Sequence, residues 1–203
     1  MITVAIETST TEGSTALFRD GELLFSQAFQ AGRNHSSLLF VSLQKAVALA
    51  PLGRGDQIVV GLGPGSYAGV RIGIAAAIGL SIATGASLVG IPSVAALARG
   101  KYLALGDARR DTFYFAQLDD GQCLEGPVLL TADALAEKLA TFPPEWQRIA
   151  SEPVPGISGL TLRYPSATRL GQLAMDGVSI VARDHLEPIY LREPHITTPK
   201  PRK

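Results

Sequence analysis

The first residues whose types suggest chemistry are Glu7, Thr8, Ser9 and Thr10, which follow a short apolar run. A carboxylate and several hydroxyls at the end of a strand can hold the phosphates of a nucleotide and a hydrated magnesium ion. The same residues can instead satisfy the backbone groups of a turn, with Glu7 as a capping residue. This motif alone leaves both interpretations open.

A glycine-rich segment from Gly61 to Gly73, GLGPGSYAGVRIG, is more specific. Its glycines permit a positive φ or a close backbone approach, and Pro64 stiffens the turn. Ser66 is placed to cap the helix that follows, and the free amides of that helix could bind an anion. A helix cap without a ligand is the alternative. The segment is not a Walker loop, because no Gly-Lys-Ser/Thr follows, and it lacks the Gly-x-Ser-x-Gly spacing of a serine hydrolase.

Metal chemistry is not indicated. His35, His185 and His195 never lie four residues apart, so the histidine pair of a helical zinc or iron site is missing. The single cysteine, Cys123, excludes an internal disulfide and a cysteine-based zinc site, and we expect an ordinary thiol there. The charges of Asp107–Asp111 predict either a salt-bridged turn or a binding site.

These residues must be positioned by an α/β chain, in which we expect a boundary near Gly100. Before it, the pattern predicts strands at Ile2–Thr8, Gln57–Leu62 and Ser87–Ile91, a hairpin of Ser14–Phe18 with Glu22–Phe29, and helices at His35–Ala50 (capped by Asn34) and Tyr67–Thr84. After it, the pattern predicts strands at Tyr102–Leu105, Thr112–Leu118, Val128–Leu130 and Pro188–Arg192, helices at Thr131–Thr141 and Ser166–Met175, and loops at Phe142–Glu145 and Glu152–Gly159.

Composition indicates a soluble globular protein, with 46% hydrophobic and 18% charged residues. Its net charge of zero disfavours a free-standing nucleic-acid binder. The segment Ile72–Ala98 has no charged residue and is long enough to span a bilayer, but Thr84-Gly85 and Pro92 break it, so we expect a buried helix and strand. Glu7 interrupts the only N-terminal apolar run, so we expect no signal peptide and a cytoplasmic protein.

The motifs together resemble one family. The Glu7–Thr10 turn, the Gly63–Gly73 block, Val89–Ser93, Asp107–Arg110 and Glu187–Arg192 occur in the order seen in TsaB proteins, over almost the whole chain. The resemblance implies the actin-like ATPase (ASKHA, ribonuclease H-like) superfold. Residues 1–100 would form an N-terminal lobe that carries the pairing helices, and residues 101–203 a reduced second lobe with a flexible basic tail.

The resemblance also implies a non-catalytic scaffold subunit required to form threonylcarbamoyladenosine beside the anticodon of tRNA. Such a subunit pairs with a TsaD-like transferase, which holds the metal. It supports recruitment of a TsaE-like ATPase and of tRNA through the complex, and we expect a homodimer when it is alone.

No catalytic or metal-binding residue is expected in this chain. ATP or ADP and magnesium are expected only in the assembled complex, because Glu7 replaces the family's usual Asp and Ala68 stands where Thr is common. The implied pairing surface lies on the two N-terminal helices, and its residues are His35, Leu39, Leu43, Val47, Ser66, Tyr67, Val70, Arg71, Ile74 and Ile78.

Two other hypotheses fit the same residues. One is a stand-alone enzyme, either an ATP-hydrolysing kinase-like protein or a peptidase. The missing histidine pair disfavours the peptidase, and Glu7 disfavours the kinase. The other is a homodimeric binding module that uses the same two helices.

Overall fold

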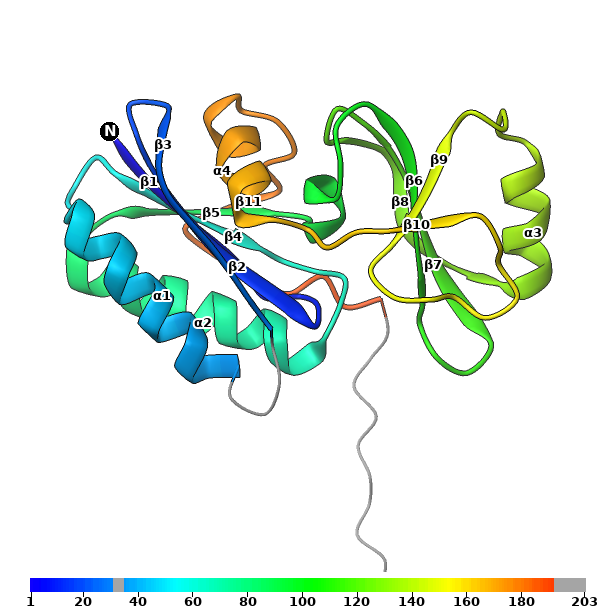
Figure 1. The fold of residues 1–203 in the computed structure, drawn as a ribbon, viewed down its shortest axis with the longest axis horizontal. Helices are drawn as coiled ribbons and strands as arrows, with labels where there is room; N and C mark the ends of the chain where they lie inside the picture. The colour runs from blue at the N-terminus through cyan, green and yellow to red at the C-terminus, as the bar shows by residue number, and fades with distance from the viewer. Residues whose placement is uncertain (31–34, 192–203) are drawn as a thin grey trace, which may run out of the picture.

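The structure is a computed structural model, and it describes residues 1–30 and 35–191. Two lobes lie side by side, each built on one sheet (Figure 1). In the first lobe the strand order is β11-β5-β4-β1-β2-β3. The three central strands are parallel, and a hairpin extends them on one side. The strands are β1 (Ile2–Glu7), β2 (Glu12–Arg19), β3 (Glu22–Gln30), β4 (Gln57–Gly61), β5 (Ser87–Ile91) and β11 (Ala182–Arg183).

The second lobe is a five-stranded sheet in the order β10-β9-β6-β7-β8. Its strands are β6 (Lys101–Asp107), β7 (Thr112–Asp119), β8 (Gln122–Thr131), β9 (Gln147–Ala150) and β10 (Leu160–Leu162). A short 3-10 helix, Ser93–Ala96, precedes this sheet.

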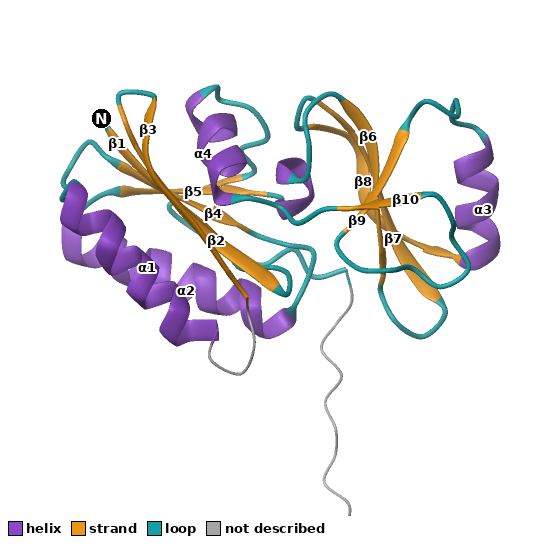
Figure 2. Ribbon diagram, viewed as in Figure 1, coloured by secondary structure: helices purple, strands orange, loops and turns teal. Residues whose placement is uncertain are grey.

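Helices and sheets alternate as layers (Figure 2). The long helices α1 (His35–Leu49) and α2 (Tyr67–Thr84) cover one face of the first sheet, and α4 (Ala167–Met175) covers the other. The helix α3 (Ala132–Ala140) covers the outer face of the second sheet.

The alternation of side chains along each strand divides the core among these layers. In β1, Val4 and Ile6 pack with α1 and α2, whereas Ala5 faces α4. In β6, Tyr102 faces the first lobe and Leu103 faces α3. The middle core layer therefore contains residues from both sheets.

The structure confirms the α/β class and the hairpin, and it places α2 at the predicted bounds. It corrects the expected division of the chain, because α4 and β11 return to the first sheet and so residues 101–203 do not form one lobe. The predicted strand at Pro188–Arg192 is wrong: its described part, Pro188–Leu191, has no strand, and Ala182–Arg183 pairs with β5 instead. The strands β9 and β10 were not predicted. The expected cap Asn34 and the C-terminal tail from Arg192 onward lie outside the described residues.

Candidate functional site

Glu7 ends β1 and is completely buried, with 0% of its surface exposed. Its Oε1 accepts a hydrogen bond from the backbone amide of Ser9 at 2.6 Å. Its Oε2 lies against Gly61, where an added Cβ would stand only 2.0 Å from it, with Ser93 Oγ beside it. Burial raises the pKa of Glu7, because desolvation outweighs the opposing interactions with Ser9 and Ser93. This carboxyl group is therefore enclosed by protein.

Thr8 is turned into the helix that follows the glycine-rich segment. Its Oγ1 donates a hydrogen bond to the carbonyl of Gly69 at 2.8 Å. Gly73, one turn further along α2, allows this approach, since a Cβ there would stand 2.3 Å from the same oxygen. The hydroxyl thus fastens β1 to α2.

Backbone and hydroxyl groups of the turn also bind within the protein, although Glu7 Oε2 and Ser9 Oγ are buried without a hydrogen-bond partner among the described residues. The carbonyl of Ser9 accepts from the amide of Ser66 at 2.6 Å, and a Cβ at Gly65 would overlap that carbonyl. Ser66 caps α2 as predicted, since its Oγ accepts from the amide of Gly69 at 3.2 Å. Thr10 donates to the carbonyl of Glu12.

These residues do not fit a magnesium-nucleotide. A carboxylate that orients hydrated magnesium must face water, and Glu7 does not. The hollow beside Ser9 and Thr10, between the two lobes, has a volume of about 10 Å³, which is room for roughly one water molecule. The glycine-rich segment closes over the turn, so the predicted nucleotide site is packed shut.

Within the described residues, the charged turn and the single cysteine have ordinary structural environments. Arg109 pairs with Asp107 at 3.0 Å, which makes the charged turn a salt-bridged one. Burial raises the pKa of Cys123, so its thiolate form is disfavoured. Residues 1–30 and 35–191 contain no group of three or more His, Cys, Asp or Glu side chains that could hold a metal ion.

The outer face of α1 and α2 is the second candidate site. Four of the residues that the resemblance placed there are buried against the first sheet and belong to the core: Leu39, Leu43, Val70 and Ile74. The expectation that these four contact a partner is corrected, because their side chains pack in one core cluster with residues of β1 and β4. Val47 is half-buried, and the side chain of His35 lies outside the described set.

Ser66, Tyr67, Arg71 and Ile78 do lie on the outer face. Sequence reasoning missed Ile82, which has the highest exposed fraction, 82%, among the large apolar residues that the structure describes. Other exposed apolar side chains on the two helices are Leu38, Phe40, Val41 and Leu49.

Sequence reasoning also missed Tyr190, whose ring stacks on that of Tyr67 with centroids 5.2 Å apart. The guanidinium of Arg71 also lies over the Tyr67 ring, 5.1 Å from its centre. The C-terminal segment therefore adds an aromatic ring to the edge of the helical face.

By length and composition alone, α2 could cross a membrane. Its buried residues, from Gly69 to Ala77, nevertheless pack on the first sheet. On its outer face, the apolar side chains of Ile78 and Ile82 are exposed.

Comparison with known proteins gives a consistent result. Residues 28–157 match the family model described as TsaD, tRNA N6-adenosine threonylcarbamoyltransferase. The tRNA threonylcarbamoyladenosine biosynthesis protein TsaB of Escherichia coli is 28% identical over 93% of this chain and 94% of its own length. The protein of the same name in Haemophilus influenzae is 30% identical over 57% of this chain and 52% of its own. Among solved structures, YeaZ from Pseudomonas aeruginosa has a TM-score of 0.70 and 23% identity, covering 94% of this chain and 99% of that one.

Proposed function

We propose that this chain, a member of the TsaB family, is a non-catalytic pairing subunit. It matches the TsaD family model and has the actin-like ATPase superfold. It is a protein of tRNA threonylcarbamoyladenosine biosynthesis, as its relatives are. Its proposed partner is a TsaD-like transferase that carries the metal, with a TsaE-like ATPase and tRNA joining the assembled complex. In the absence of that partner, the same face would pair two copies of this chain.

The observation that carries the proposal is the uncovered apolar face of α1 and α2. The two helices pack side by side on the first sheet (Figure 1), and each leaves large apolar side chains in water. Several large exposed apolar side chains on neighbouring helices are typical of an interface in soluble proteins. Tyr67 and Arg71 at its edge are of the residue types that most often anchor such interfaces.

The closed turn at Glu7 supports the non-catalytic part of the proposal. Nucleotide binding at this turn would require the glycine-rich segment to lift away from Ser9 and Thr8, breaking the hydrogen bonds that hold it. If the turn stays closed, ATP and magnesium are held by the partners. Turnover of ATP by the purified chain alone would favour the stand-alone enzyme instead.

A charge on the helical face tests the pairing. We expect the wild-type chain to form a complex with its cognate TsaD-like protein at micromolar concentrations, measured by size-exclusion chromatography with light scattering. Ile82→Glu should weaken that complex at least tenfold, because it buries a carboxylate in an apolar contact. The thermal midpoint of the variant alone should hardly change, since Ile82 is exposed.

Leu162→Glu is the matched control, because Leu162 is also an exposed apolar residue but lies on β10 in the second lobe. It should pair as the wild type does. The proposal fails if no complex forms at micromolar concentrations, or if Ile82→Glu and the control behave alike.

A further inference from the structure

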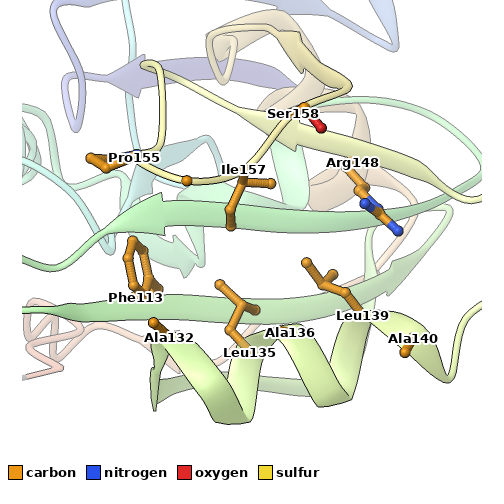
Figure 3. A pocket seen from close by; sticks show the side chains of 11 residues that line it. Phe113, Ala132, Leu135, Ala136, Leu139, Ala140, Arg148, Pro155, Ile157 and Ser158 are labelled. Atoms are coloured by element: carbon orange, nitrogen blue, oxygen red, sulfur yellow. The ribbon is translucent and has the colours of Figure 1, made fainter.

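The second lobe contains a hollow that the proposed function does not use. It has a volume of about 360 Å³ and lies between α3 and the loop at Pro155–Ser158 (Figure 3). This volume is within the range of small-molecule pockets in proteins. The hollow lies on the far side of the second sheet from the helical face of α1 and α2.

The floor of the hollow is apolar. Leu135 and Leu139 of α3 belong to the outer core layer and rise toward Ile157 on the opposite wall. Ala136, on the same side of the helix, is too short to fill the space between them. Short side chains on the helix and an open loop opposite it therefore leave room for an apolar molecule.

One cation lies at the end of this hollow. Strand alternation places Arg148 of β9 on the side of α3, while the next residue, Ile149, enters the middle core layer. Figure 3 shows Phe113 and Ala132 at one end and Arg148 at the other. The hollow is thus apolar along its length and cationic at one end.

Within residues 1–30 and 35–191, the half-buried Arg148 side chain has no ion pair and no hydrogen bond. Two other cations of this lobe are paired: Lys138 lies 2.6 Å from Glu125, and Arg109 forms an ion pair with Asp107. A guanidinium at the edge of an apolar hollow attracts an anion more strongly than one in open water, and its planar fork matches a carboxylate.

The dimensions limit the length of the ligand. From Ala132 to Ala140 the axis of α3 advances about 12 Å. An extended chain of roughly ten bonds covers that distance.

We propose that this hollow binds a small amphiphilic carboxylate. Its apolar chain lies over the exposed Ala136 of α3, between the buried Leu135 and Leu139 and the loop residue Ile157, and its carboxylate is held by Arg148. The site is independent of the helical face and of any partner bound there.

Titration of the full chain with decanoate, below its micelle concentration, tests the proposal, with decanol as the uncharged probe. We expect saturable binding of decanoate that shifts the methyl signals of Leu135, Leu139 and Ile157 in NMR spectra. Arg148→Met should weaken decanoate at least tenfold and leave decanol unchanged, because only the charged contact is lost. Ala136→Phe should remove the binding of both probes by filling the hollow.

Arg163→Met is the matched control, since Arg163 is an exposed arginine that does not line the hollow, and it should bind decanoate as the wild type does. The proposal is overturned if decanoate does not saturate the wild-type chain by about 1 mM. It is also overturned if decanol binds as tightly as decanoate, which would indicate a purely apolar occupant. The methyl shifts of the wild-type chain test the site even if a variant does not fold.

Discussion

Glu7 places a carboxyl group in the core, at a position where the resemblance to actin-like ATPases suggests magnesium chemistry. Desolvation is the largest influence on its pKa and raises it above the ordinary value of 4.5. The native state therefore keeps a proton on Glu7 at pH values where the unfolded chain has lost it. A neutral carboxyl group suits a turn that packs against Gly61 and Ser93, and it does not suit a cation site.

This difference makes stability depend on pH. Because the native state binds more protons above pH 4.5, the free energy of unfolding should fall as the pH rises through the raised pKa. The slope is at most about 1.4 kcal/mol per pH unit. Glu7→Gln imitates the protonated side chain and should remove this slope, so the variant should gain on the wild type as the pH rises.

Urea unfolding at a series of pH values measures the effect. Glu22→Gln, which changes an exposed carboxylate at the start of β3, is the control and should follow the wild-type profile. If the wild type and Glu7→Gln have parallel profiles above pH 4.5, then Glu7 is ionised in the native state.

At the scale of elements, the glycines of α2 have two different effects. Gly73 allows a close contact with β1, whereas Gly79 makes no such contact and only lowers the helix propensity. Gly73 faces Thr8 Oγ1, and a Cβ there would stand 2.3 Å from it, whereas Gly79 has nothing within 4 Å of an added Cβ. Gly73→Ala should displace Thr8 and its hydrogen bond to Gly69, at a cost of about 1–3 kcal/mol in unfolding free energy. Gly79→Ala should instead stabilise by up to about 1 kcal/mol through helix propensity.

Both glycine variants can be compared by urea unfolding at low protein concentration, so that association does not contribute. Opposite signs are the expected result. Equal destabilisation would mean that the outer face of α2 is as tightly packed as its inner face, which contradicts the exposure of Gly79.

Sequence patterns predicted this element well because their signals are local. The Ser66 cap and the Gly85 end fix both ends of α2. The same local signals could not say which side of the helix faces the sheet. With apolar residues on every side, Ile74 and Ile78 look alike in the sequence, yet only Ile78 is exposed.

The incorrect predictions concern features that depend on contacts between residues far apart in the sequence. The short strand β11 pairs with β5, which lies about 90 residues earlier in the chain. The two residues of β11, Ala182 and Arg183, carry no local pattern that predicts this pairing. Glu7 resembled a ligand for hydrated magnesium because its burial cannot be read from its neighbours in the sequence. That burial depends on Gly61 and Ser93, which come from other elements.

At the scale of the whole molecule, the two lobes share one core layer. Phe18 and Val59 of the first sheet and Tyr102 and Leu118 of the second belong to the same buried cluster. Tyr102 also donates through its hydroxyl to the carbonyl of Val94 at 2.8 Å, across the junction between the lobes. Separating the lobes would expose this layer, so they should unfold together.

The single tryptophan allows this cooperativity to be measured. Trp146 lies in the second lobe, beside Phe142, whereas α1, α2 and α4 of the first lobe dominate the far-ultraviolet circular dichroism. Ile58→Val removes a methylene from the layer under α1 and α2 and should cost about 0.5–1.5 kcal/mol. That loss should lower the urea midpoint seen by Trp146 fluorescence as much as the midpoint seen by circular dichroism. If the fluorescence midpoint stays in place while the other falls, the lobes unfold separately and the shared layer does not couple them.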